Sequence, residues 1–229
     1  MDSGHQNLAR AADAAVPGQA ERFANLASEL AAAGRGFYER GWVLGTSGNF
    51  SGVISRDPMR LAITSTGLDK GSLESSSFIE MDEQARVVHG SGDPSAEALL
   101  HVAIVRELRA GAVLHTHSVW STVLSGAHAA KSGVEIHGYE MLKGLEGVRT
   151  HDHREWLPIL ENSQDMTELS ARVAKLLRES RGVHGFLLRE HGLYTWGATV
   201  QEAKRHVEIL EFLMEVLMRS CTTVRPEKV

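Results

Sequence analysis

The chain has 229 residues, of which 42% are hydrophobic and 23% charged, as in an ordinary globular protein large enough to bury a core. Its net charge is −5, and no long basic run supports a nucleic-acid partner. The single cysteine, Cys221, excludes an intrachain disulfide and favours a cytoplasmic location. The sequence contains no run of about eighteen apolar residues, so it gives no indication of a membrane partner. The unusual feature is the presence of 12 histidines.

Residues 1–20 are small and polar. They lack the basic stretch followed by an apolar core that marks a secretory signal, so we expect a flexible N-terminal segment. No linker divides the rest of the chain. We therefore predict a single domain over residues 21–229 rather than two small domains.

The N-terminal half of this domain is predicted to mix helices and short strands. Apolar residues at three- or four-residue steps indicate an amphipathic first helix, and short apolar runs indicate strands. In chain order, the expected elements are a helix from Glu21 to about Gly34, a glycine-rich loop over 44–52, strands over 59–65 and 85–89, a helix over 96–109 and a strand over 112–117.

The C-terminal half continues the alternation, and its last helix has the clearest signal. Thr199 and Glu202 fit a capping box, and a helical stripe of apolar residues follows them. Because helices and strands interleave with short connections, we predict one α/β domain with helices on both faces of its sheet. The other expected elements are a short helix from Ser118, strands over 134–137 and 158–161, a helix over 167–178 and strands over 186–189 and 193–196.

His115 and His117 end the apolar strand of residues 112–117. Side chains at positions i and i+2 of a strand point to the same face, so both imidazoles can reach one ion. Catalytic zinc commonly has three protein ligands and one open position. The alternative is a pair of histidines that only cap the strand.

The third ligand has more than one candidate. His191 lies in a turn after a strongly apolar strand, whereas His151 and His153 lie in a polar, loop-like segment. Loop histidines are more often solvated, so we prefer His191. His101 is a weaker candidate, because packing on its helix is the simpler explanation. Structural or surface roles are expected for the histidines without a spacing partner, which are His89, His128, His137, His184 and His206.

Two turns, over residues 46–51 and 64–71, are rich in glycine and hydroxyl groups. Glycine lets backbone N–H groups approach an anion, and hydroxyls and a lysine add donors and charge. Neither turn matches a nucleotide-binding motif, and ordinary turn chemistry is the alternative. Together with the segment around Ser95 they fit a pocket for a small phosphate ester. The candidate phosphate contacts are Asn49, Ser65, Thr66, Gly67, Lys70 and Ser95.

Two carboxylates are candidates for proton transfer. Glu140 follows a short apolar strand, and a glutamate beside a metal-bound carbonyl substrate can take a proton from the adjacent carbon. Glu97 is a second candidate, as a base or as a metal contact. For Glu97 taken alone we favour the alternative, in which it complements the dipole at the start of a helix. The residues alone do not decide the role of Glu140.

Several motifs in a fixed order make the sequence similar to a known family. They are G-N-F-S at 48–51, T-S-T-G-L-D-K-G at 64–71, P-S-A-E-A-L-L-H at 94–101, A-V-L-H-T-H-S at 112–118 and R-E-H-G-L-Y-T-W-G at 189–197. From about Glu21 to Met218 the chain resembles the class II aldolase/adducin family. The resemblance implies a three-layer α/β/α sandwich with a central, predominantly antiparallel sheet. It also implies a homotetramer with active sites at subunit interfaces.

The resemblance further implies one Zn²⁺ per subunit, held by His115, His117 and His191, with Glu140 on the catalytic acid/base position. The segments H-G-Y-E-M-L-K-G-L at 137–145 and L-P-I-L-E-N at 157–162 look most like the family's dehydratases of methionine salvage. These lyases remove water from a small phosphorylated sugar. The segment with Glu97 also resembles that of sugar-phosphate aldolases, so an aldolase or epimerase is the alternative. A non-catalytic, adducin-like interaction module is disfavoured by the three histidines and Glu140.

Overall fold

The computed structural model describes residues 18–223, and side chains as far as Ser220. Most of the expected flexible segment, 1–20, and the side chain of Cys221 lie outside this part of the chain. No helix within it is long and apolar enough to span a membrane. The helices are α1 (Gln19–Glu39), α2 (Ala98–Leu108), α3 (Val119–His128), α4 (Met166–Glu179) and α5 (Val200–Thr223).

The core of the fold is a nine-stranded sheet in the order β4-β3-β2-β1-β5-β9-β8-β7-β6. Its neighbours pair antiparallel except β7 and β8, which are parallel. The strands are β1 (Asn49–Arg56), β2 (Met59–Thr64), β3 (Phe78–Asp82), β4 (Val87–His89), β5 (Ala112–Thr116), β6 (Gly133–His137), β7 (Arg154–Leu160), β8 (Gly185–Leu188) and β9 (Gly192–Gly197).

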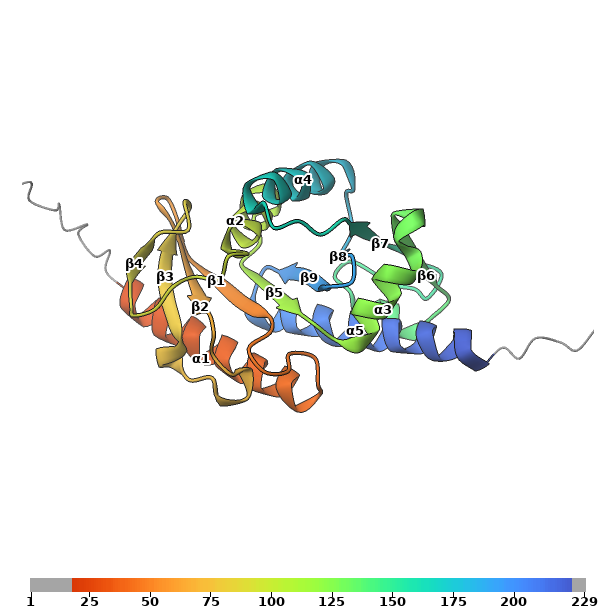
Figure 1. Cartoon of the computed structure of the whole chain (residues 1–229), viewed down its shortest axis with the longest axis horizontal. Helices are drawn as coiled ribbons and strands as arrows, with labels where there is room; N and C mark the ends of the chain where they lie inside the picture. The colour runs from red at the N-terminus through yellow and green to blue at the C-terminus, as the bar shows by residue number, and fades with distance from the viewer. Residues whose placement is uncertain (1–17, 224–229) are drawn as a thin grey trace, which may run out of the picture.

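Helices cover both faces of this sheet. Figure 1 shows α2 and α4 together on one face, and α1 and α5 on the other, where α3 packs against α5. Buried side chains of α2 and α4 form one apolar cluster with the sheet, and those of α1, α3 and α5 fill two more. The predicted three-layer α/β/α arrangement with a mostly antiparallel sheet is confirmed.

Three strands differ from the sequence prediction. β3 was not predicted, because Glu80 and Asp82 interrupt its apolar pattern, yet all 5 of its residues are buried. Ion pairs to Arg60 and Arg86 compensate these two carboxylates. β1 begins inside the expected loop over 44–52, and β7 begins before residue 158, where the polar start of the strand pairs with β6.

β5 lies at the centre of the sheet and positions the candidate site. Along this strand His115 is paired with Asn49 of β1 on one side and with Tyr194 of β9 on the other. One of the two hydrogen bonds of the predicted capping box at the start of α5 is present, because the Glu202 backbone N–H donates to Thr199 Oγ1 at 3.1 Å. The end of β5 therefore lies beside the starts of β1 and β9, which brings side chains from distant segments together.

Candidate active site

Three histidines converge where β5 ends. The Nε2 atom of His117 lies 2.7 Å from Nε2 of His115 and 3.1 Å from Nε2 of His191. The remaining pair, His115 and His191, is 3.4 Å apart. His117 follows directly after the strand, where its backbone N–H donates to the Trp42 carbonyl at 2.7 Å. The structure therefore places His191, and not His151 or His153, beside the His115–His117 pair.

The turn between β8 and β9 holds His191 in place. Glu190 has a left-handed backbone with φ 52°, and its N–H donates to Ser125 Oγ of α3 at 2.9 Å. Thr122, also on α3, donates to the His191 carbonyl at 3.2 Å. Gly192 lets β9 start directly against β5, because a Cβ there would lie 2.1 Å from the Thr116 carbonyl oxygen.

His115 is fixed by two contacts with β9. Its Nδ1 lies 2.9 Å from the Leu193 carbonyl oxygen, which can only accept, so Nδ1 carries the proton and Nε2 presents a lone pair. Its ring stacks on Tyr194 with centroids 3.8 Å apart. A ring N–H donated to a backbone carbonyl is the usual support for a metal-bound histidine. Tyr194 is not predictable as a site residue, because the apolar pattern of its strand already explains it.

Glu97 joins the three histidines. Its carboxylate lies 3.1 Å from His191 Nε2 and 3.5 Å from His115 Nε2, and it accepts a hydrogen bond from Asn49 Nδ2 at 2.7 Å. Although Glu97 is the N-cap residue of α2, it makes no side-chain capping bond. Its geometry is that of a metal contact rather than of a helix-dipole partner.

The protonation states of this group suit a divalent cation. Burial lowers the pKa of His115 to about 4 and that of His117 to about 3, so both imidazoles are neutral at neutral pH. Burial would raise the pKa of Glu97, but His115, His191 and Asn49 together hold it well below its usual range. Lone pairs on converging nitrogens repel one another unless a cation lies between them.

The spacing of the donors supports the same conclusion. Zinc–imidazole bonds of about 2.0–2.1 Å imply ligand atoms roughly 3.3 Å apart in a tetrahedron, close to the observed nitrogen separations. The four donors Glu97, His115, His117 and His191 all lie within 4.8 Å of one another. Imidazole and carboxylate ligands fit a first-row divalent metal. Glu140 is not a member of this group.

A cavity of about 150 Å³ lies beside the histidines and is also lined by Glu97 and His117. It brings together both predicted turns and the segment around Ser95, which are far apart in the sequence. Every residue predicted to contact phosphate lines it, namely Asn49, Ser65, Thr66, Gly67, Lys70 and Ser95. The metal group and the predicted phosphate pocket are thus adjacent.

Lys70 and Asn49 have structural partners within this pocket. The buried Lys70 donates through Nζ to the carbonyls of Thr46 at 3.0 Å and Leu68 at 2.8 Å, and burial lowers its pKa. It ties the two turns together and keeps one N–H free of these bonds. Asn49 contacts His101 through its oxygen, while its amide orients Glu97.

His101 is a packed core histidine, as its simpler interpretation suggested. It is fully buried, and its other ring nitrogen lies 2.7 Å from Ser51 Oγ. Burial lowers its pKa to about 4. It supports the metal group through Asn49 and does not itself reach the three histidines.

Glu140 lies apart from the histidines of its own chain. It begins the 3-10 helix η4 (Glu140–Gly144), and its side chain is 71% exposed. It pairs with Lys143 and lies 4.0 Å from His151 Nδ1, and it does not line the phosphate pocket. The carboxylate therefore faces outward from this copy of the chain.

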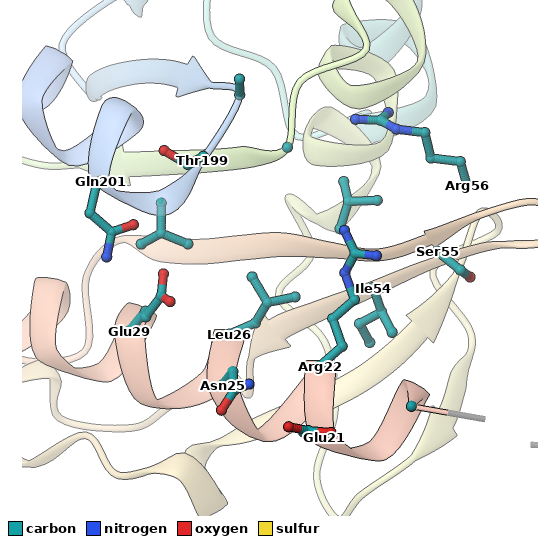
Figure 2. Close-up of a pocket in the computed structure, with 15 residues that line it drawn as sticks. Glu21, Arg22, Asn25, Leu26, Glu29, Ile54, Ser55, Arg56, Thr199 and Gln201 are labelled. Carbon is teal, nitrogen blue, oxygen red and sulfur yellow. The ribbon is translucent and has the colours of Figure 1, made fainter. Parts of the chain in front are cut away.

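A larger cavity of about 670 Å³ lies elsewhere, between α1, β1 and the start of α5. Figure 2 shows side chains of α1, among them Glu21, Arg22 and Glu29, facing this space together with Arg56 and Thr199. It has carboxylates and guanidinium groups but shares no lining residue with the histidine group. We therefore place the candidate active site at the smaller cavity.

Known proteins resemble this chain over most of its length. A methylthioribulose-1-phosphate dehydratase of Pectobacterium atrosepticum is 46% identical over 180 residues, covering 77% of this chain and 85% of the relative. One from Hahella chejuensis is 42% identical over 195 residues, covering 84% and 92%. The solved L-fuculose-1-phosphate aldolase of Thermus thermophilus shares the fold, with a TM-score of 0.69 at 22% identity, covering 89% and 97% of the two chains.

A family model described as the class II aldolase and adducin N-terminal domain matches residues 28–218. That range contains the three histidines, Glu97 and every residue of the phosphate pocket. It also contains Glu140. The chain belongs to the class II aldolase and adducin family.

Proposed function

We propose that this protein is a methylthioribulose-1-phosphate dehydratase of methionine salvage that works in the cytoplasm. It converts 5-methylthioribulose 1-phosphate to 2,3-diketo-5-methylthiopentyl 1-phosphate and water. The observation that carries the proposal is the agreement of two relatives, which are 46% and 42% identical to this chain over 180 and 195 aligned residues and are dehydratases of this substrate by name. The adjacent metal group and pocket supply the chemistry that this reaction needs.

The substrate sits with its phosphate in the cavity formed by the two turns. Gly67 and the hydroxyl-bearing residues Ser65, Thr66 and Ser95 line this cavity, so their polar groups can bind that anion. Because His117 and Glu97 line the same cavity, the carbonyl end of the sugar reaches the histidine group. His115, His117 and His191 would hold the zinc ion, and Glu97 would be an additional contact.

When bound, zinc supplies a Lewis acid that polarises the C2 carbonyl and acidifies the hydrogen on C3. Glu140 takes that proton as a general base and returns a proton to the C4 hydroxyl, which departs as water. The resulting enol rearranges to the second ketone. Because no carbon–carbon bond breaks, no fragment is released.

Glu140 performs this role in the active site of a neighbouring copy within a homotetramer. Its exposed position away from its own histidines supports this assignment. Exposed apolar side chains next to it and on the adjoining helices provide a surface that a second copy can cover. They are Met141 at 40%, Val119 at 63%, Val123 at 45% and Phe212 at 45% exposure.

The test is an assay of the purified, zinc-loaded protein on 5-methylthioribulose 1-phosphate. The products are separated and their masses are measured by mass spectrometry. We expect a single phosphorylated product lighter by one water. A two- or three-carbon fragment would instead identify an aldolase, and a product of unchanged mass an epimerase. The zinc content of the same sample shows whether an inactive result reflects a protein that lacks its metal.

A further inference from the structure

A second group of metal-type ligands lies between β7 and the start of β8, which are neighbours in Figure 1. It consists of His153, Glu155 and His184, whose donor atoms lie within 4.8 Å of one another. Glu155 Oε2 is 2.8 Å from His153 Nε2 and 2.9 Å from His184 Nδ1. None of these residues belongs to the candidate active site. One carboxylate oxygen is thus flanked by two imidazole nitrogens.

The tautomer of His184 follows from its other contact. His184 Nε2 lies 2.8 Å from the carbonyl oxygen of Glu146. A carbonyl can only accept a hydrogen bond, so Nε2 carries the ring proton. In the neutral ring, Nδ1 then presents a lone pair to the Glu155 carboxylate, which is also an acceptor. Two acceptors at this distance require a positive charge, which is either a proton on Nδ1 that donates to the carboxylate or a metal ion beside both groups.

A chain of hydrogen bonds holds His184 in this orientation. The buried His206 lies 2.7 Å from the Trp196 carbonyl through Nδ1, so that its Nε2 accepts the backbone N–H of Glu146 at 3.1 Å. Glu146 therefore accepts from His184 through its backbone carbonyl and donates to His206 through its backbone N–H. Donation of the second ring N–H to a backbone carbonyl is the support that metal-binding histidines usually have.

Glu155 is buried on the strand, with a side-chain exposure of 1%, whereas His153 is 30% exposed. The Oε1 atom of Glu155 accepts a hydrogen bond from the His184 backbone N–H at 2.9 Å. The Oε2 atom of Glu155 therefore remains for the two imidazole rings. A buried carboxylate needs compensation by a cation. His153 lies on the solvent side of the group, where an ion can enter and a water molecule can complete its coordination.

We propose that His153 Nε2, Glu155 Oε2 and His184 Nδ1 form a second, structural site for a divalent transition metal of the zinc class. The ion links the start of β7 to the residues that directly precede β8. The two-histidine, one-carboxylate donor set suits zinc or its neighbours. A proton on His184 is the competing cation, but it joins only two of the three converging groups.

The experiment counts zinc in the full-length protein after equilibration with zinc chloride and dialysis, using inductively coupled plasma mass spectrometry. The wild type is expected to keep about two ions per chain, one in each group. His153→Ala should keep about one. The matched control is His151→Ala, because His151 is exposed and lies outside both groups; it should keep about two. One ion in the wild type, or two in His153→Ala, would overturn the proposal.

Cobalt separates the two sites without reference to activity. In a His117→Gln background, the candidate active site loses a ligand, so a visible absorption band from added Co²⁺ should come from the second site. Adding His153→Gln should abolish that band, and adding His151→Gln should leave it. Thermal unfolding by circular dichroism shows whether each variant is folded. A band that survives His153→Gln in a folded protein assigns the cobalt elsewhere and rejects the site.

Discussion

His117 is the member of the histidine group that the active-site cavity exposes, and its Nε2 contacts both other rings. We expect His117→Gln to lose metal from this group and to lower kcat/KM by more than about a hundredfold, because the Lewis acid is lost. Metal analysis and steady-state kinetics measure the two effects. His137→Gln is the control, since His137 is exposed at the end of β6 and outside the group. Full activity in a metal-depleted His117→Gln sample would contradict the assigned role.

Glu211 is a buried acid on α5 that accepts a hydrogen bond from Thr116 Oγ1 at 2.7 Å. Burial raises its pKa from 4.5 to about 7, against the opposing effect of the hydrogen bonds. The folded protein therefore keeps a proton that the unfolded chain releases above pH 4.5. The stabilisation from this proton is fully present below pH 4.5 and is lost as pH rises through about 7, and the total loss is roughly 3 kcal/mol.

We expect Glu211→Gln to remove this pH dependence while its amide oxygen still accepts from Thr116. Relative to the wild type, the variant should gain free energy of unfolding between pH 5 and pH 8. Urea unfolding of both proteins at the two pH values measures the difference, and titrations common to both cancel. An equal difference at pH 5 and pH 8 would show that Glu211 is already ionised in the folded protein.

The elements themselves were predictable where one physical signal dominated. The stripe that begins at Thr199 and the apolar run before His115 each gave the correct element. β3 was missed because its burial depends on ion pairs with Arg60 and Arg86, which come from other segments. No local pattern reports such pairs.

The candidate site was likewise predictable only in part. Spacing joined His115 to His117 within one strand, and the location of His191 after an apolar strand distinguished it from His151 and His153. Their convergence, however, depends on pairing between β5 and β9. The His153–Glu155–His184 group was not predicted, because His184 lies 29 residues from its carboxylate partner and has no ligand spacing to it. Local patterns find ligands on one strand but not across strands.

β5 and β9 approach each other closely at Gly192, and this approach aligns the histidines. A substitution of Gly192 tests its importance. A Cβ at this position would lie 2.1 Å from the Thr116 carbonyl oxygen and 3.0 Å from His115 Cε1. We expect Gly192→Ala to lower the free energy of unfolding by about 1–3 kcal/mol, since backbone must move, and to weaken metal binding. Denaturant unfolding and zinc titration measure both.

The control is Gly36→Ala in α1, where a Cβ would meet nothing within 4 Å. Because alanine favours a helix over glycine, this variant should be more stable by up to about 1 kcal/mol. Unchanged stability and zinc affinity in Gly192→Ala would show that the two strands can separate without cost. The close approach would then not be needed for the histidine geometry.

At the scale of the whole molecule, the exposed position of Glu140 predicts how much activity a mixture of two inactive variants regains. If the carboxylate serves a neighbouring copy, each active site combines the histidine group of one subunit with Glu140 of another. His117→Gln and Glu140→Gln homotetramers are then both inactive, for different reasons. A mixed tetramer contains some sites in which an intact histidine group meets an intact Glu140 from the adjacent subunit.

Co-expression of the two variants with different tags, followed by sequential affinity purification, isolates such mixed tetramers. With random assembly in equal amounts, half of the histidine groups are intact and half of the neighbours carry Glu140, so roughly a quarter of wild-type activity should return. Glu140→Gln keeps the size and polarity of the side chain, and light scattering checks that each variant assembles as the wild type does. If Glu140 instead acts within its own chain, every subunit has one defect. The mixture then stays as inactive as either parent, because no arrangement of the subunits can supply both groups to one substrate.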